Sequence, residues 1–228
     1  MKEALLPTGV ADTASVLASW PIMQDFYLSG GTALALQQGH RQSRDLDFFT
    51  RQPLTVLPEL PGTDAFLARF GNVEWILRAP DQIHWRLDGV SVTLLAYPFA
   101  HAFPFRSWRG LAVADARDIA VQKAYTLGRR AQARDYLDLH TILQTGVLSL
   151  DEVIHRAQNT YHGDFSARLF LQQLTYTRDL PDRDEALNLL TTPHAFDVIE
   201  RELQTAVRQW IAQHVAAPTP QPPQGPRL

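Results

Sequence analysis

Two carboxylates that flank a single leucine are the most informative chemical feature of this chain. Asp45 and Asp47 enter an apolar run, Leu46-Asp47-Phe48-Phe49, and a charge inside a buried strand needs a partner. Because strand side chains alternate, both carboxylates face one side while Leu46 and Phe48 face the other. The pair can therefore bind one divalent cation or straddle two. Mg²⁺ suits this pattern, with Mn²⁺ as an alternative, because such ions bind through few carboxylates together with substrate phosphates.

A glycine turn precedes the acidic strand. Gly30, Gly31 and Thr32 open a short helix, which is expected over residues 32–38. Glycines let backbone N–H groups approach a phosphate closely, and the helix start adds the positive end of its dipole. On its own, a Gly-Gly pair indicates a turn, and an Asp-x-Asp pair indicates the solvated edge of a strand. Together, in this order, they indicate a site for a nucleotide carried by a divalent metal.

The choice of basic residue singles out one lysine. The chain has only two lysines, Lys2 and Lys123, against nineteen arginines. A lysine at position 123 therefore suggests a need for a compact, rotatable ammonium, as for a triphosphate oxygen. The alternative is an ordinary lysine on a helix surface.

Arginines also gather around Lys123 in the sequence. They outnumber the nearby acids and could hold a triphosphate or an RNA backbone, although a solvated basic helix face explains some of them equally well. These arginines are Arg106, Arg109, Arg117, Arg129, Arg130 and Arg134.

The segments before residue 114 predict an α+β or α/β domain built around one sheet. Strands are expected over residues 26–29, 45–50, 73–78, 83–87 and 91–97, and helices over residues 32–38 and 63–70. Gly39 is expected to end the first of these helices. Asp88-Gly89 is expected to form a hairpin turn, since both positions require positive φ. Trp75 and Trp85 are expected in the core or in cross-strand packing.

After residue 114 the apolar period becomes helical. Helices are expected over residues 115–127, 131–144, 150–161, 164–175 and 195–214. Asp115 is expected to cap the first of them and Gly128 to end it. We therefore predict a sheet domain over residues 1–113, a helical bundle over residues 114–216, and a proline-rich tail over residues 217–228. Such a tail is a solvated end or a ligand for a proline-reading module.

Composition excludes several classes of protein. At 228 residues, with 45% apolar and 20% charged residues, the chain has the composition of an ordinary globular protein. A formal net charge of −3 does not indicate a nucleic-acid binder in bulk, and the absence of cysteine excludes disulfides, thiolate metal sites and a cysteine nucleophile. Because no secretory signal or membrane-length apolar run is visible, a cytoplasmic protein without a membrane partner is expected.

The motifs together resemble a known family. Residues 30–34, Gly-Gly-Thr-Ala-Leu, followed by His40-Arg41-x-Ser43-x-Asp45-Leu46-Asp47-Phe48-Phe49, are similar to the first motif of AbiEii/AbiGii-type nucleotidyltransferase toxins. That family belongs to the DNA polymerase β-like nucleotidyltransferase superfamily. The resemblance resumes at Lys123-Ala124 and at Arg134-Asp135-x-x-Asp138-Leu139, so it spans roughly residues 26–140.

The resemblance implies a polymerase β-like domain, with a mixed sheet flanked by helices, that is followed by a helical bundle. It implies catalytic roles for Asp45, Asp47, Lys123 and Asp135, with Mg²⁺ held by the first two. It also implies nucleotide binding by the segment that contains Gly30, Gly31, Thr32, Arg41 and Ser43. The implied partners are an NTP substrate, an RNA (tRNA) acceptor and a protein antitoxin.

Two positions leave alternatives open. Asp138 lies on the same face of its helix as Asp135, and either serves the site or forms an ion pair with Arg134 or Arg130 on a solvated face. Many polymerase β-like enzymes carry a third acid on a later strand, whereas Thr93 stands at that position here.

The favoured function is Mg²⁺-dependent transfer of an NMP from an NTP to an acceptor hydroxyl by a toxin. One alternative is a nucleotide- or antitoxin-binding module without activity, which Thr93 would explain. The other is a small-molecule nucleotidyltransferase of the antibiotic-modifying kind.

Overall fold

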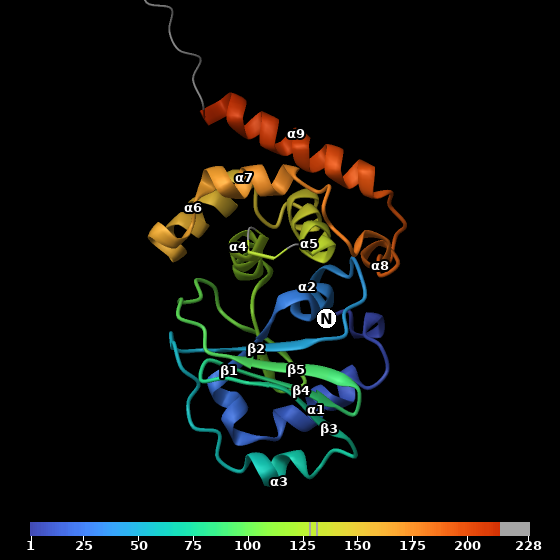
Figure 1. Ribbon diagram of the computed structural model, residues 1–228, viewed down its shortest axis with the longest axis vertical. Helices are drawn as coiled ribbons and strands as arrows, with labels where there is room; N and C mark the ends of the chain where they lie inside the picture. Colours follow the sequence, from blue (N-terminus) through green and yellow to red (C-terminus); the bar gives the residue numbers. More distant parts are fainter. Residues whose placement is uncertain (128, 131, 215–228) are drawn as a thin grey trace, which may run out of the picture.

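The computed structural model describes residues 1–127, 129–130 and 132–214. A twisted sheet occupies one half of the molecule and a stack of helices the other (Figure 1). Helices α1 and α3 cover the outer face of the sheet, while α2 and α4 lie between the sheet and the remaining helices (Figure 1). The structure confirms a mixed sheet with flanking helices followed by a helical region.

The sheet has seven strands in the order β3-β4-β5-β2-β1-β7-β6. The strands are β1 (Phe26–Ser29), β2 (Leu46–Thr50), β3 (Val73–Arg78), β4 (Gln82–Leu87), β5 (Val90–Leu95), β6 (Arg106–Trp108) and β7 (Leu111–Val113). The central strand β2 pairs antiparallel with β1 and parallel with β5. The strand that carries Asp47 is therefore inside the sheet, with neighbours on both sides.

The helices cover the sheet and then stack on one another. They are α1 (Val10–Ala18), α2 (Gly30–Gln38), α3 (Thr63–Leu67), α4 (Ala116–Leu127), α5 (Ala133–Gln144), α6 (Leu150–Tyr161), α7 (Ala167–Thr175), α8 (Arg183–Leu187) and α9 (Phe196–His214). Short 3₁₀ turns occupy Glu3–Leu5, Pro21–Asp25 and His162–Asp164. Each described element after β7 is helical, and α4 and α5 both contact α2.

Local sequence signals explain several boundaries. Asp88 and Gly89 have φ of 47° and 87° and form the predicted hairpin turn between β4 and β5. Gly39 ends α2 with φ of 67°, and its N–H donates to the Ala35 carbonyl at 2.8 Å. The Asp115 carboxylate accepts from the Arg117 N–H at 3.1 Å, which confirms the predicted cap of α4.

Other elements differ from the sequence prediction. Helices α1 and α8 and the β6–β7 hairpin were not expected, while α3 ends at Leu67 rather than at residue 70 and α7 begins at Ala167 rather than at residue 164. Trp75 and Trp85 are cross-strand partners with ring centroids 5.4 Å apart. Trp75 is nevertheless 43% exposed, because β3 is the edge strand. The prediction of core or cross-strand packing is confirmed, with Trp85 in the core and Trp75 in a cross-strand pair at the edge.

Three predictions concern residues outside the described part of the chain. They are the helix end at Gly128, the helix start at residue 131 and the proline-rich tail over residues 217–228. Helix α5 is described from Ala133. Within the described residues, no helix combines the length and the apolar character that crossing a bilayer requires.

Candidate active site

One small cavity brings together most of the residues that the sequence singled out. It has a volume of about 50 Å³ and lies where the start of α2, the start of β2, α4 and α5 meet. Its lining residues are Gly31, Arg41, Ser43, Asp45, Asp47, Lys123, Arg130, Gln132, Arg134 and Asp135. Seven of the nine predicted site residues are among them, and the other two, Gly30 and Thr32, lie just behind the lining.

The carboxylates of Asp45, just before β2, and of Asp47, on β2, both line this cavity. The alternation predicted for this strand is observed, since Leu46 and Phe48 are fully buried while Asp47 is partly exposed. Asp45 lies just before the strand, is 38% exposed, and has the Arg134 guanidinium 3.4 Å away. Burial, followed by the charge of Asp45, raises the pKa of Asp47 above its usual value. The negative charge of Asp45 therefore acts on Asp47, as expected for two carboxylates that face one cavity.

Gly30 and Thr32 hold the acidic strand rather than line the cavity. Gly30 has φ of 67°, and a Cβ at this position would lie 2.9 Å from Asp47 Oδ2. The Thr32 hydroxyl is buried and donates to the Asp45 carbonyl at 2.5 Å. The glycine turn thus lets the helix approach the strand closely, and Thr32 fixes the backbone at the first carboxylate.

Gly31 makes room for an arginine instead. A Cβ on Gly31 would fall on the Arg41 guanidinium and would lie 3.1 Å from Ser43 Oγ. Arg41 and Ser43 are both buried. The second glycine therefore permits close packing of two residues that the sequence assigned to nucleotide binding.

Thr93 lies at the position where the resemblance to polymerase β-like enzymes predicts a third acidic residue. In the parallel pairing of β2 with β5, Thr93 is the direct partner of Asp47. A hydrogen bond from its side chain lowers the pKa of Asp47, which only partly offsets the effect of burial and of Asp45. In the part of the chain that the structure describes, no cluster of three or more His, Asp or Glu side chains could hold a metal ion.

Asp138 is the hub of a buried ionic network. Its Oδ1 accepts from His40 Nε2 and from Arg41 Nε, each at 2.7 Å. Its Oδ2 accepts from Arg41 Nη2 at 2.9 Å and lies 2.6 Å from Lys123 Nζ. Burial opposes ionisation, but these cations hold the pKa of Asp138 well below its usual value.

The alternative of a solvated ion pair between Asp138 and Arg134 or Arg130 is therefore wrong. The Asp138 side chain is fully buried, and its partners come from the segment after α2 and from α4. His40 and Asp138 are the two members of this network that the sequence did not place in the site. They are 98 residues apart, so no local pattern indicates that they meet.

Lys123 joins the hub to the cavity. Its ammonium lies 2.7 Å from Asp135 Oδ1 and 2.6 Å from Asp138 Oδ2, and only 5% of the residue is exposed. Arg130 donates to both oxygens of Asp135, at 2.8 and 2.9 Å. Although burial would raise the pKa of Asp135, Lys123 and Arg130 outweigh it and hold this pKa below its usual value. An ordinary lysine on a helix surface is thus excluded.

The donor set of the cavity suits a divalent cation and a phosphate. Two carboxylates that repel each other, on one side of the cavity, match the hard oxygen ligands that Mg²⁺ prefers. Four cationic side chains line the same cavity, namely Arg41, Lys123, Arg130 and Arg134, and they match a phosphate. The residues present therefore fit the metal that the sequence suggests.

Comparisons with known proteins agree with this geometry. Residues 20–74 match the family described as "Nucleotidyl transferase AbiEii toxin, Type IV TA system". This segment contains β1, α2 and β2, which carry the glycine turn and both carboxylates. A protein of Aquifex aeolicus (strain VF5), the uncharacterized protein aq_aa25, is 31% identical over 170 residues, which are 72% of this chain and 79% of that protein.

Solved structures share the fold. The crystal structure of JHP933 from Helicobacter pylori has a TM-score of 0.55 at 15% identity, over 90% of this chain and 92% of that one. A second structure from the same bacterium has a TM-score of 0.54 at 14% identity, over 89% and 95% of the two chains. The shared fold thus extends over about nine-tenths of this chain.

The residues matched by the family are those that build the acidic side of the cavity. The relative from A. aeolicus extends the similarity over most of the chain. The chain belongs to the AbiEii family of nucleotidyl transferase toxins, and it is an enzyme of the nucleotidyltransferase class.

Proposed function

We propose that this toxin is a divalent-metal-dependent enzyme that transfers an NMP from an NTP to a hydroxyl group of RNA. The observation that carries the proposal is the meeting of Asp45 and Asp47 with four cationic side chains in one cavity. In the proposed reaction the acceptor oxygen forms a bond to the α-phosphorus, the bond to the β-phosphate oxygen breaks, and pyrophosphate and a proton leave. Negative charge builds up on the phosphate oxygens, so fixed positive charge beside them lowers the barrier.

Asp45 and Asp47 would hold Mg²⁺ or Mn²⁺. When bound, the metal would neutralise phosphate charge and orient the triphosphate. Arg134 lies beside Asp45, has a side chain that is 34% exposed, and can turn toward a phosphate. Arg41 and Lys123 are buried and tied to Asp138, so they supply fixed positive charge rather than mobile arms.

Asp135 is a poor choice for the general base. The cations beside it hold its pKa low, which makes the carboxylate a weak proton acceptor. We assign it instead to holding Lys123 and Arg130 at the cavity.

The nucleoside must lie outside the small cavity. Its volume of about 50 Å³ has room for a few water molecules or for a cation with phosphate oxygens. A neighbouring cleft of about 290 Å³ shares Arg130 with it and also offers Arg129, Tyr136 and Tyr176. Tyr176 is 50% exposed and could stack on a base. We assign the nucleoside of the NTP or of the acceptor to this cleft.

Arginines at the mouth of the cavity favour RNA over a small acceptor. The side chains of Arg130 and Arg134, which line the cavity, are 47% and 34% exposed, so both can reach a phosphate backbone. A small-molecule acceptor would instead need a deep pocket next to the carboxylates. The family description also supports an antitoxin as the partner of this toxin.

The test is transfer of label from each α-³²P-labelled NTP to total RNA in the presence of Mg²⁺. Asp45→Asn and Asp47→Asn should each abolish label transfer, since each removes a metal ligand. Asp64→Asn is the matched control, because Asp64 is an exposed residue of α3 outside the cavity. Equal transfer by wild type and both site variants would refute the site.

The second candidate is a nucleotide-binding module without turnover. Thr93, beside Asp47 in place of a third acid, is the observation that favours it. Calorimetry with each NTP separates the two functions. NTP binding that depends on Asp45 and Asp47, without label transfer to any RNA, would support the module and contradict the enzyme.

A further inference from the structure

Gln132 lines the active-site cavity but has no part in the reaction proposed above. It directly precedes α5 and is the N-cap residue of that helix, yet its side chain forms no capping hydrogen bond. Ser, Thr, Asp and Asn are the side chains that cap helices well, and glutamine is not among them. The side chain of Gln132 is therefore not used to start the helix.

The cap of α5 comes from Asp182 instead. The Ala133 N–H group at the start of α5 donates to Asp182 Oδ1 at 2.9 Å, across 49 positions of the sequence. Asp182 is itself the N-cap residue of α8, where an aspartate usually accepts from its own helix, but it forms no such bond. A distant carboxylate thus satisfies the first turn of α5, and the Gln132 amide is left to line the cavity.

The buried cations of the cavity have few hydrogen-bond donors left for a substrate. Lys123 Nζ lies 2.7 Å from Asp135 Oδ1 and 2.6 Å from Asp138 Oδ2. All three side-chain nitrogens of Arg41 donate to protein acceptors, two of them to Asp138. Arg130 donates to Asp135 through Nε and Nη2. These side chains supply positive charge, but a phosphate oxygen is bound best by donors that point at it.

Arg134 and Gln132 are better placed to donate to a phosphate. The contact of Arg134 with Asp45 is long, at 3.4 Å, and Gln132 is only partly buried. The amide of Gln132 carries two N–H donors and no charge. Because it is neutral, it does not form an ion pair with Asp45 or Asp47 in place of a metal.

We propose that Gln132 is a substrate-contacting residue, whose Nε2 amide donates a hydrogen bond to a non-bridging oxygen of the triphosphate. The inference rests on the proposed function in that the triphosphate belongs to it. Asp182 makes the contact possible, because it caps α5 in place of the glutamine. Capping and substrate contact are therefore tasks of two different residues, and each task can be measured.

The binding test uses inorganic triphosphate with Mg²⁺, titrated into the full chain by calorimetry at constant ionic strength. Gln132→Ala removes one hydrogen bond to a charged group and should weaken binding by at least about tenfold. Gln132→Glu also brings a carboxylate to the phosphate, so it should weaken binding further.

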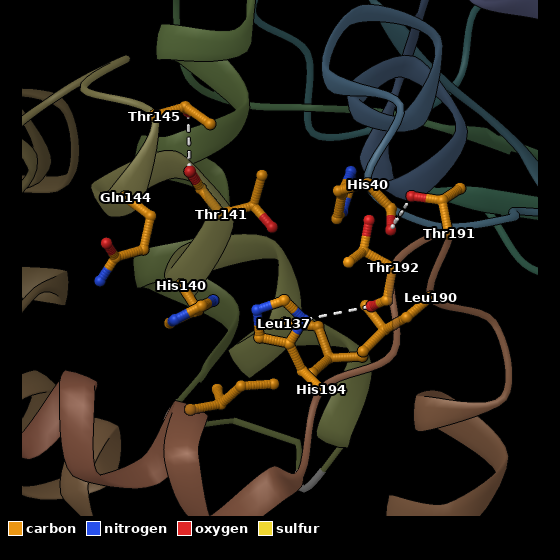
Figure 2. Close-up of a pocket in the computed structure, with 11 residues that line it drawn as sticks. His40, Leu137, His140, Thr141, Gln144, Thr145, Leu190, Thr191, Thr192 and His194 are labelled. Atoms are coloured by element: carbon orange, nitrogen blue, oxygen red, sulfur yellow. Dashed lines mark hydrogen bonds between the residues drawn. The ribbon is translucent and has the colours of Figure 1, made fainter.

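Gln144, at the other end of α5, is the matched control. Figure 2 shows it at a separate pocket, which shares none of its described lining residues with the active-site cavity. Gln144→Ala and Gln144→Glu should both bind triphosphate as wild type does.

Thermal unfolding separates the two tasks. Asp182→Ala should lower the melting temperature by about 2–4 °C, which is the effect of one lost cap in a chain of this size. Gln132→Ala should melt as wild type does, because it removes no cap. The inference is overturned if Gln132→Ala binds triphosphate as wild type does, or if Gln132→Ala rather than Asp182→Ala lowers the melting temperature.

Triphosphate binding does not require turnover, so the two proposals can fail separately. The expected loss of binding in Gln132→Ala, without label transfer to RNA by wild type, would support the contact and contradict only the proposed reaction. No binding of triphosphate by wild type would overturn the contact together with the phosphate site.

Discussion

Removal of the charge at the centre of the ionic network should cost much more stability than removal of a charge in the cavity itself. Asp138→Asn keeps the shape of the side chain but leaves Arg41 and Lys123 without their shared carboxylate. These side chains are only 2% and 6% exposed, so water cannot replace the lost partner. The amide also points an N–H group at a cation, whichever way it is turned.

The expected loss is about 3–5 kcal/mol, the usual cost when one partner of a buried ion pair is removed. This is a large part of the roughly 5–15 kcal/mol that holds a typical domain folded. Asp45→Asn is the comparison, because Asp45 is 38% exposed and its contact with Arg134 is 3.4 Å long. Asp45→Asn should therefore lower the free energy of unfolding by no more than about 1 kcal/mol.

Urea unfolding followed by tryptophan fluorescence measures both free energies, with equal slopes required for a valid comparison. The pH dependence of the free energy of unfolding provides a second test. Because the folded pKa of Asp138 is depressed, its stabilising effect is full above the ordinary aspartate pKa and is lost as the pH falls through the folded value. The difference in free energy of unfolding between wild type and Asp138→Asn should therefore become smaller in strong acid. Similar losses for the two variants at neutral pH would refute the account of the network.

Three further predictions concern the acidic side of the cavity. Thr93→Asp places a third carboxylate beside Asp47. It should lower the melting temperature of the metal-free protein and increase the rise in melting temperature that Mg²⁺ causes, both measured by calorimetry. An unchanged response to Mg²⁺ would contradict the position of Thr93 beside Asp47. Gly30→Ala should cost at least about 1–2 kcal/mol in urea unfolding because of its φ of 67° and its closeness to Asp47, whereas Gly163→Ala, which has open space, should cost less. Because the pKa of Asp47 is raised, Mg²⁺ affinity measured by titration calorimetry should begin to fall, as the pH is lowered, while the pH is still above the ordinary aspartate pKa; an affinity that stays constant down to that pKa would contradict the prediction.

The sequence predicted the site best where function depends on local geometry. The alternation around Asp45 and Asp47 placed both carboxylates on one face, and the positive φ required at Gly39 and at Asp88-Gly89 placed a helix end and a hairpin. Each of these signals lies within a few residues of the feature that it predicts.

Sequence-based prediction failed for contacts between residues that are far apart in the chain. For Asp138 the sequence left two alternatives open, and only the fold shows that His40, Arg41 and Lys123 surround it. Helix α1 was missed although its buried residues, Val10, Thr13, Ala14 and Leu17, recur at spacings of three and four. The exposure of Trp75 depends on β3 being an edge strand, which is a property of the topology alone.

The most direct test of the central claim is a crystal structure of the protein with Mn²⁺ and a non-hydrolysable NTP, with the metal located by anomalous scattering. The account predicts an anomalous peak bound by both Asp45 and Asp47, with the triphosphate between it and Arg134. A nucleotide that binds elsewhere, or an anomalous peak that contacts neither carboxylate, would contradict it.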